Sequence, residues 1–182
     1  MAKKMALTTM IFAFILLCVL NFSAYSNGNV SAGNMLWNHR YAKNVVMEEV
    51  NNTMSEYEKA VKLKEYVCQN IDYSEEEGSH YQVPKIKHSL KKHTGVCYDY
   101  ATTYAALCRE AGLKCLYFGG TNNGEYHSWN KVCVDGIWYF VDITQDSYCR
   151  QTGRDEMKQG LIPTSSKEEV PVGFNYTITE RS

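Results

Sequence analysis

The sequence predicts an α+β fold in which helices cover one side of an antiparallel sheet. Three observations support this prediction: two helical patterns come first along the chain, alternating strand patterns follow them, and a tight turn joins the two clearest strands. The chain has 182 residues, of which 45% are hydrophobic and 21% are charged. This is an ordinary globular composition with enough length for one core, so a single folded domain is expected.

The first predicted helix covers residues 55–71. Ser55 and Glu58 form a capping-box pattern, and apolar residues recur behind them at helical spacing. The apolar positions are Tyr57, Ala60, Val61, Val67, Cys68 and Ile71. The polar stretch 72–94 that follows is long for a connection in a compact domain. We therefore expect it either to hold a short helix near Ser89 or to shape the rim of a binding site.

The second predicted helix begins at the sequence T-G-V-C and ends at Ala111, where Gly112 supplies a left-handed stop. Its apolar positions lie on one side at helical spacing, which predicts a buried central helix. These positions are Cys97, Ala101, Tyr104, Ala105 and Cys108. A strand over 114–118, turn residues over 119–124 and a further strand within 170–179 complete the predicted elements outside the main hairpin.

The N-terminal residues have the three parts of a secretory signal: Lys3 and Lys4, an apolar run over 10–20, and small residues before a cleavage site after Ser26. The apolar run is shorter than the roughly 20 residues of a spanning helix, so cleavage is favoured over a membrane anchor. We expect residues 1–26 to be a signal peptide, 27–50 a flexible leader with little structure up to about Asn44, and 51–182 the folded domain. The mature protein is expected to be secreted or otherwise extracytoplasmic.

Charge and cysteine spacing exclude several classes of protein. The formal net charge is −1, and the sequence has no basic helix or aromatic-basic platform, which argues against a nucleic-acid binder. The chain has seven cysteines, and Cys18 lies in the predicted signal peptide. The others show no C-x-x-C and no regular framework, so their pairing cannot be assigned and a zinc site is not expected. No cofactor is expected.

The segment 124–144, G-E-Y-H-S-W-N-K-V-C-V-D-G-I-W-Y-F-V-D-I-T, predicts two strands joined by a two-residue turn at Asp135-Gly136. In that register His127 and Asp142 are diagonal neighbours on one face, at about 7–8 Å between backbones. A three-residue loop would break this geometry. A lone histidine or aspartate in such a position is more often structural than catalytic. A carboxylate that holds one nitrogen of the imidazole, however, leaves the other nitrogen free to act as a base.

Cys97 is the candidate nucleophile for this base. It lies at the start of the second predicted helix, where unpaired N–H groups and the positive end of the helix dipole favour a thiolate. The other cysteines of the predicted mature chain have no such position. A small buried cysteine would fit the apolar stripe equally well, and periodicity does not separate the two interpretations.

Three segments carry a resemblance. T-G-V-C-Y-D-Y-A, Y-H-S-W-N and Y-F-V-D-I-T resemble, in order, the signature blocks of the transglutaminase-like superfamily, a branch of the papain-like thiol enzymes that includes bacterial proteases and peptide N-glycanases. The resemblance covers about residues 66–144. It implies that Cys97 is the nucleophile, His127 the base and Asp142 the residue that orients the base. It also implies a papain-like core, in which the cysteine helix packs on the sheet that carries His and Asp.

The sequence departs from the papain pattern at the oxyanion hole. Lys91 stands where a papain-type enzyme has a glutamine. The Cys97 N–H is one possible donor, and the weak candidates for the second are Tyr73, Tyr81 and Gln82. Trp129 is expected to fill the core rather than to wall the site. We do not expect the accessory domains and calcium sites of animal transglutaminases within these 182 residues.

The resemblance implies acyl transfer through a thioester on the cysteine. The expected function is a secreted cysteine peptidase or amidase that acts on peptide or glutamine-type amide bonds. One alternative is a cross-linking transglutaminase, and another is a catalytically silent peptide- or cell-wall-binding module with the same fold. The expected partner is a peptide or protein substrate, with membrane contact only if the N-terminal segment is not cleaved.

Overall fold

The computed structural model describes residues 32–74, 86–152, 160–171 and 174–181. The chain divides into two compact units, Met1–Met35 and Leu36–Ser182. The predicted signal peptide, residues 1–26, lies outside the described residues, as do residues 27–31 of the predicted leader. The description below concerns the second unit, together with the helix that leads into it.

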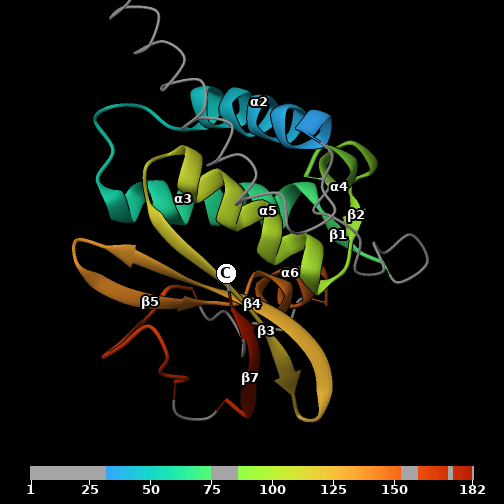
Figure 1. Ribbon diagram of the computed structural model, residues 1–182, viewed down its shortest axis with the longest axis vertical. Coiled ribbons are helices and arrows are strands. Elements are labelled where there is room, and N and C mark those ends of the chain that lie inside the picture. The colour runs from blue at the N-terminus through green and yellow to red at the C-terminus, as the bar shows by residue number, and fades with distance from the viewer. Residues whose placement is uncertain (1–31, 75–85, 153–159, 172–173, 182) are drawn as a thin grey trace, which may run out of the picture. The chain divides into compact units, whose positions relative to one another are not determined.

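Five antiparallel strands form the main sheet, in the order β6-β5-β4-β3-β7 (Figure 1). Along the chain they are β3 (Lys114–Asn122), β4 (Glu125–Val134), β5 (Ile137–Val141), β6 (Ile162–Thr164) and β7 (Tyr176–Arg181). A separate two-stranded parallel sheet joins β1 (Asp72–Tyr73) to β2 (Thr94–Gly95). The described helices are α2 (Ala32–Glu49), α3 (Glu56–Asn70), α4 (Ile86–Lys92), α5 (Cys97–Glu110) and α6 (Ile143–Thr152). The predicted α+β class is confirmed.

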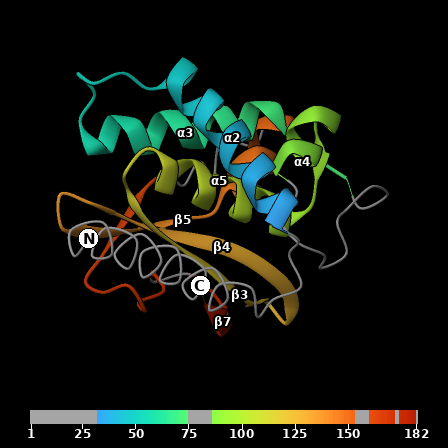
Figure 2. The same ribbon diagram turned by 45° about the horizontal axis from the view of Figure 1, so that its top comes forward.

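Helices α3 and α5 lie on one side of the main sheet, as Figures 1 and 2 both show. Helix α5 packs on β3 and β4, and α3 packs on α5. Two tyrosine hydroxyls tie these helices together: Tyr100 donates to the Ile71 carbonyl at 2.6 Å, and Tyr104 to the Ala60 carbonyl at 3.1 Å. The prediction of a buried central helix is confirmed, and this helix positions the candidate nucleophile.

The capping box at the start of α3 is confirmed. The Glu58 carboxylate accepts the Ser55 backbone N–H at 2.8 Å, and the Ser55 hydroxyl accepts the Glu58 N–H at 3.2 Å. The Ser55 hydrogen bonds also lower the pKa of Glu58. The long polar connection does contain a short helix, α4, which includes Ser89.

The prediction of little structure before Asn44 is wrong for the residues of α2. Asn, Ser and Gly in this stretch suggested a loop, but apolar side chains further along give α2 a face that can be buried. Ala42 is 2% exposed and Val45 is 5% exposed, and both belong to the core that lies between the helices and the sheet. Tertiary packing therefore overrides the local composition.

The main hairpin has the predicted register but a shorter second strand. Val134 pairs with Ile137 and Asn130 with Val141. Asp135 and Gly136 have φ angles of 50° and 82°, as a tight two-residue turn requires. Strand β5 nevertheless ends at Val141, and α6 begins at Ile143 instead of a strand that continues to Thr144.

The strand before this hairpin is longer than predicted. β3 continues through Gly119 to Asn122, and only Asn123 and Gly124, with φ angles of 53° and 89°, form the turn into β4. Near the C-terminus, the strand expected within 170–179 is present as β7, which starts later and extends to Arg181. Strand β6 and helix α6 had no clear sequence signal.

The side of the sheet that faces away from α5 carries an aromatic cluster. Its buried members are Phe118, Trp129 and Phe140, and Phe174 and Tyr176 pack against them. We call these five residues the aromatic face. It differs from the apolar core under the helices because it draws on the chain beyond residue 170. Within the described residues, none of the helices is both long enough and apolar enough to cross a bilayer.

Candidate active site

The start of α5 is fixed by a carboxylate that folds back over it. Asp99 Oδ2 accepts the Val96 backbone N–H at 3.0 Å, and Asp99 Oδ1 accepts the Ser89 hydroxyl at 3.1 Å. A Cβ on Gly95 would lie 2.7 Å from the Asp99 Cβ, so the glycine makes room for this cap. The T-G-V-C-Y-D pattern therefore places Cys97 in the first turn of α5, at the positive end of the helix dipole.

The predicted contact between His127 and Asp142 is present. His127 Nε2 lies 2.7 Å from Asp142 Oδ2, although the two residues are 15 positions apart in the sequence. His127 is 7% exposed and Asp142 is fully buried. The histidine comes from β4, and the aspartate follows the last residue of β5. The hairpin register aligns the two side chains as expected.

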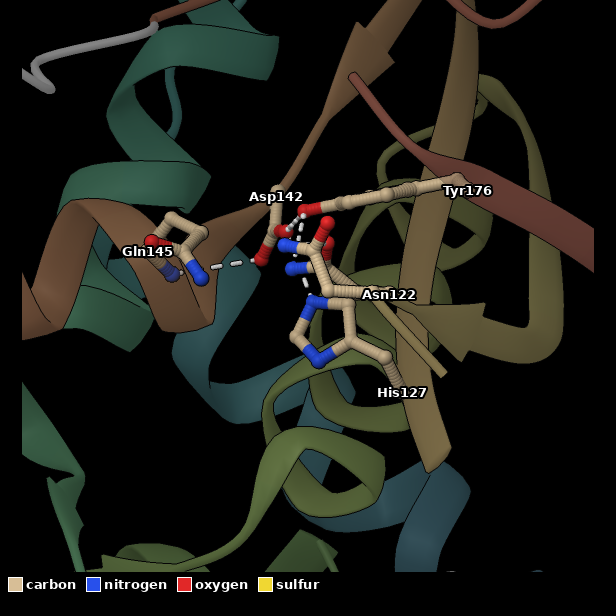
Figure 3. Close-up of polar contacts among 6 residues, drawn as sticks. Asn122, His127, Asp142, Gln145 and Tyr176 are labelled. Carbon is tan, nitrogen blue, oxygen red and sulfur yellow. Dashed lines mark hydrogen bonds and ion pairs between the residues drawn. The ribbon is translucent and has the colours of Figure 1, made fainter. Parts of the chain in front are cut away.

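Asp142 accepts hydrogen bonds on both carboxylate oxygens. Oδ1 accepts the Gln145 backbone N–H at 3.2 Å, which caps the start of α6. Oδ2 accepts the hydroxyl of Tyr176 in addition to its contact with His127. Figure 3 shows these groups converging on the carboxylate. The capping role also explains why β5 stops one residue before Asp142, since an N-cap residue begins a helix.

The electrostatics of the pair favour the imidazolium form of His127. Burial of the ring opposes its charged form and lowers its pKa, but the charge and hydrogen bond of Asp142 outweigh this, with smaller contributions from Cys97. Together they raise the pKa of His127 to about 10. The Cys97 thiol is within hydrogen-bonding reach of the ring. Because Asp142 holds Nε2, Nδ1 is the nitrogen left for the thiol, and it points away from Asp142 in Figure 3.

Tyr176 is a site residue that sequence reasoning missed. Its ring packs edge-on against His127 with 5.4 Å between centroids, and its hydroxyl also lies 3.4 Å from the Asn122 amide nitrogen. Burial, together with the charge and hydrogen bond of Asp142, raises the pKa of Tyr176 well above its usual value, so the hydroxyl stays protonated and donates. The alternation within 170–179 predicted a strand there but gave no partner for it.

Trp129 belongs to the core, as predicted. It is 1% exposed and stacks on Phe118 with centroids 6.1 Å apart. Its other neighbours are the His127 ring, stacked at 6.2 Å, and the Tyr176 ring at 4.9 Å. The tryptophan therefore supports the histidine from within the aromatic face.

The second oxyanion donor has no assigned residue. Tyr73 in β1 pairs with Gly95 in β2, and Gly95 lies two residues before Cys97. Tyr73 is 39% exposed. Lys91 is exposed near the end of α4. Tyr81 and Gln82 lie outside the described residues.

Among the cysteines whose side chains the structure describes, Cys97, Cys108, Cys115 and Cys133 are free thiols. In the part of the chain that the structure describes, no group of three or more His, Cys, Asp or Glu side chains is placed to hold a metal ion.

A cysteine that opens a helix, beside a histidine–aspartate pair on an antiparallel sheet, is the arrangement of a papain-like fold. The family model of the transglutaminase-like superfamily matches residues 43–143, more than half of the chain. The chain belongs to this superfamily.

Two solved structures with a similar fold are a candidate cysteine protease from Cytophaga hutchinsonii and a protein called a TGase. The first has a TM-score of 0.52 and 16% identity, over 85% of this chain and 55% of that chain. The second has a TM-score of 0.54 and 18% identity, over 88% of this chain and 41% of that chain. At these identities the likeness concerns the fold alone.

Among curated proteins, the chain is similar to kyphoscoliosis peptidase of mouse (Mus musculus) and of human (Homo sapiens). Each is 28% identical over 96 residues, which is 45% of this chain. The matched region spans only 14% of the length of those relatives. The similarity therefore concerns one part of much longer proteins.

Proposed function

We propose that this protein is an exported thiol enzyme that hydrolyses amide bonds of peptides or glutamine side chains, with Cys97, His127 and Asp142 as its catalytic residues. The observation that carries the proposal is the position of the His127 ring. Asp142 holds its Nε2 at 2.7 Å, and Cys97 at the start of α5 is within reach of the same ring. The names of the similar proteins, which include a peptidase and a candidate cysteine protease, support the reaction class.

In the first half of the reaction, His127 Nδ1 already holds the proton of the Cys97 thiol, and the Cys97 thiolate attacks the amide carbonyl carbon. A carbon–sulfur bond forms, and the carbonyl oxygen carries the negative charge. The backbone N–H of Cys97 is one donor for this oxyanion, since the first N–H groups of a helix have no partner within the helix. The carbon–nitrogen bond then breaks, and the imidazolium gives its proton to the leaving amine.

In the second half, the neutral imidazole takes a proton from water, and the oxygen attacks the thioester carbon. The carbon–sulfur bond breaks, releasing the acid and restoring the thiolate beside the imidazolium. The raised pKa of His127, about 10, keeps the imidazolium available as the acid at neutral pH. Asp142 holds the ring in place through its contact with Nε2.

Transfer to an amine instead of water would make the same site a cross-linking transglutaminase. The thioester is common to both reactions, and the acceptor depends on which molecule reaches it. The likeness of the fold to a protein called a TGase keeps this candidate open to test.

Turnover of a glutamine-containing peptide tests the reaction and its acceptor together. The mature chain is incubated with the peptide, with and without a primary amine, and ammonia, new peptide termini and amine adducts are measured. Ammonia or new termini without added amine indicate hydrolysis, and adducts indicate transfer; Cys97→Ala is expected to abolish either. A panel of peptides that gives no product above the Cys97→Ala background would contradict the proposal and favour a silent binding module.

Export is part of the proposal, supported by the basic, apolar and small-residue pattern of residues 1–26. N-terminal sequencing of the chain after passage through a secretory pathway is expected to begin at Asn27. Recovery of the full chain in the membrane fraction would indicate a signal anchor instead.

A further inference from the structure

The Tyr176 hydroxyl and the His127 ring meet on the same atom of the candidate site. Tyr176 donates its O–H to Asp142 Oδ2, the oxygen that lies 2.7 Å from His127 Nε2. Its ring also contacts the rings of His127 and Trp129. Tyr176 therefore touches both members of the pair, but only the carboxylate receives its hydrogen bond.

The buried carboxylate needs donors in fixed directions. Asp142 is fully buried, and the χ2 torsion of aspartate is broad, so its oxygens are not oriented by the rotamer alone. The Gln145 N–H holds Oδ1 at 3.2 Å, while the tyrosine holds Oδ2. Loss of the hydroxyl would leave the side of the carboxylate that faces His127 without a second anchor and with an unfilled lone pair.

The packing of β7 on β3 delivers this hydroxyl. Gly120 pairs with His127 on one side and with Ile178 on the other. A Cβ on Gly120 would meet the Thr177 carbonyl oxygen at 1.8 Å, so the missing side chain allows the close approach of β7. Strand β7, which carries Tyr176, therefore runs directly beside the position in β3 that pairs with His127.

A register shift sets the direction of the tyrosine. The β3–β7 pairing shifts by one residue between Gly119 and Gly120, after which Asn122 pairs with Tyr176. Paired residues share a face, so Tyr176 points to the face of His127 and Trp129. Without the shift, the side chain would point to the opposite face, toward the helices. The irregularity in β7 therefore has a direct effect at the site.

We propose that Tyr176 is a positioning residue, which holds Asp142 against His127 and makes β7 a required part of the catalytic site. This inference rests on the proposed function, but the family pattern does not contain it, because the matched segment ends at residue 143. The site formed by Cys97, His127 and Asp142 thus also needs β7, which lies beyond that segment.

A double-mutant cycle tests whether Tyr176 acts through Asp142. The rate of Cys97 alkylation by iodoacetamide is followed across pH by mass spectrometry in the mature wild type, Tyr176→Phe, Asp142→Asn and the double variant. Loss of a hydrogen bond to a charged group predicts that Tyr176→Phe slows alkylation at neutral pH by about tenfold. In the Asp142→Asn background the same change is expected to have less than about a twofold effect.

Two controls separate positioning from loss of structure. Arg181→Ala removes another side-chain contact of β7, from its guanidinium to the Glu168 carboxylate at 2.7 Å, without touching Asp142 or the register shift. Tyr104→Phe removes a buried hydroxyl of the same kind from α5. Both are expected to leave the alkylation profile unchanged. As a second readout, the Nε2 proton of His127 is followed by NMR in Cys97→Ala, where we expect a downfield signal because this nitrogen is hydrogen-bonded to a carboxylate. Tyr176→Phe is expected to reduce that downfield shift.

The outcomes distinguish this inference from the proposed function. Equal slowing by Tyr176→Phe in both backgrounds, or an unchanged Nε2 proton signal, would overturn the positioning role while the cysteine–histidine pair stands. Alkylation that does not depend on His127 at all would overturn the proposed function, and the inference with it.

Discussion

The two faces of the main sheet are built in different ways. The core under the helices is an apolar cluster in which tyrosine hydroxyls reach the backbone carbonyls of Ala60 and Ile71. The other polar groups on this side include Asn130, which donates to the Ala101 carbonyl of α5, and the ion pair between Lys64 and Asp146.

The aromatic face contains the ionisable Tyr176 and lies against His127, Asp142 and Lys131. Lys131 is 1% exposed and donates to the Thr164 hydroxyl at 2.7 Å, and burial lowers its pKa to about 8.

The difference separates the part of the molecule that holds the fold from the part that holds the chemistry. Helix α5 crosses between them, because its buried stripe faces the apolar core while its first residue, Cys97, lies within reach of His127. Charged side chains on the aromatic face are kept by specific partners, since an unpaired buried charge is costly. Changes to this face should therefore alter reactivity more than changes of similar size under the helices.

The largest expected effect comes from the hairpin turn. Insertion of one residue between Asp135 and Gly136 shifts the register of β5 by one and moves the Asp142 side chain to the opposite face. We expect Cys97 alkylation to fall to the rate of His127→Ala. Insertion of two residues preserves the face and is the matched control. A one-residue insertion with full Cys97 reactivity would show that the hairpin register does not align the pair.

A smaller effect is expected from Gly120→Ala, which tests the aromatic face alone. The new Cβ would collide with the Thr177 carbonyl oxygen, so β7 must move, at a cost of about 3 kcal/mol in the free energy of unfolding. Gly112→Ala is the control: its φ of +84° strains alanine by about 1 kcal/mol, but nothing lies within 4 Å. Denaturant unfolding measures both. Equal losses for the two variants would show that β7 does not depend on the close approach at Gly120.

The smallest effect is a pH dependence of stability. The folded pKa of His127, about 10, lies above its ordinary value of 6.5. Its contribution is therefore fully present below about pH 6.5 and is lost as the pH rises through about 10. The lowered pKa of Lys131 has the opposite effect between about pH 8 and 10.5. The free energy of unfolding is measured against pH for wild type and for Asp142→Asn, and the difference between the two removes the contribution of Lys131. A difference that stays constant from pH 6 to 10 would contradict the raised pKa of His127.

The sequence predicts most of what depends on local signals. The capping box of α3, the apolar stripe of α5 and the Asp135-Gly136 turn are each written in a few neighbouring residues, and the turn was enough to bring His127 to Asp142. The helix α2 was missed because its stability comes from tertiary packing of Ala42 and Val45. The N-cap function of Asp142 was missed because a strand pattern and a helix start overlap at that residue.

Tyr176 shows the limit most clearly. It lies 34 residues beyond Asp142 along the chain, and its direction depends on a one-residue shift in the pairing of β7 with β3. Neither the pairing of distant strands nor the position of a bulge follows from local periodicity. The residues of the candidate site that the sequence predicts are thus those linked by a short hairpin or placed at a helix start.

The reactivity of Cys97 tests the central claim most directly. Limiting iodoacetamide is applied across pH to the mature chain, and labelling is read by mass spectrometry, with the more exposed Cys133 as internal reference. Cys97 and Cys108 share the tryptic peptide between Lys92 and Arg109, so fragment ions are needed to separate them. We predict that Cys97 labels faster than Cys133 at neutral pH although it is only 7% exposed, and that His127→Ala removes this advantage. Labelling of Cys97 no faster than Cys133, and unchanged by His127→Ala, would contradict the account.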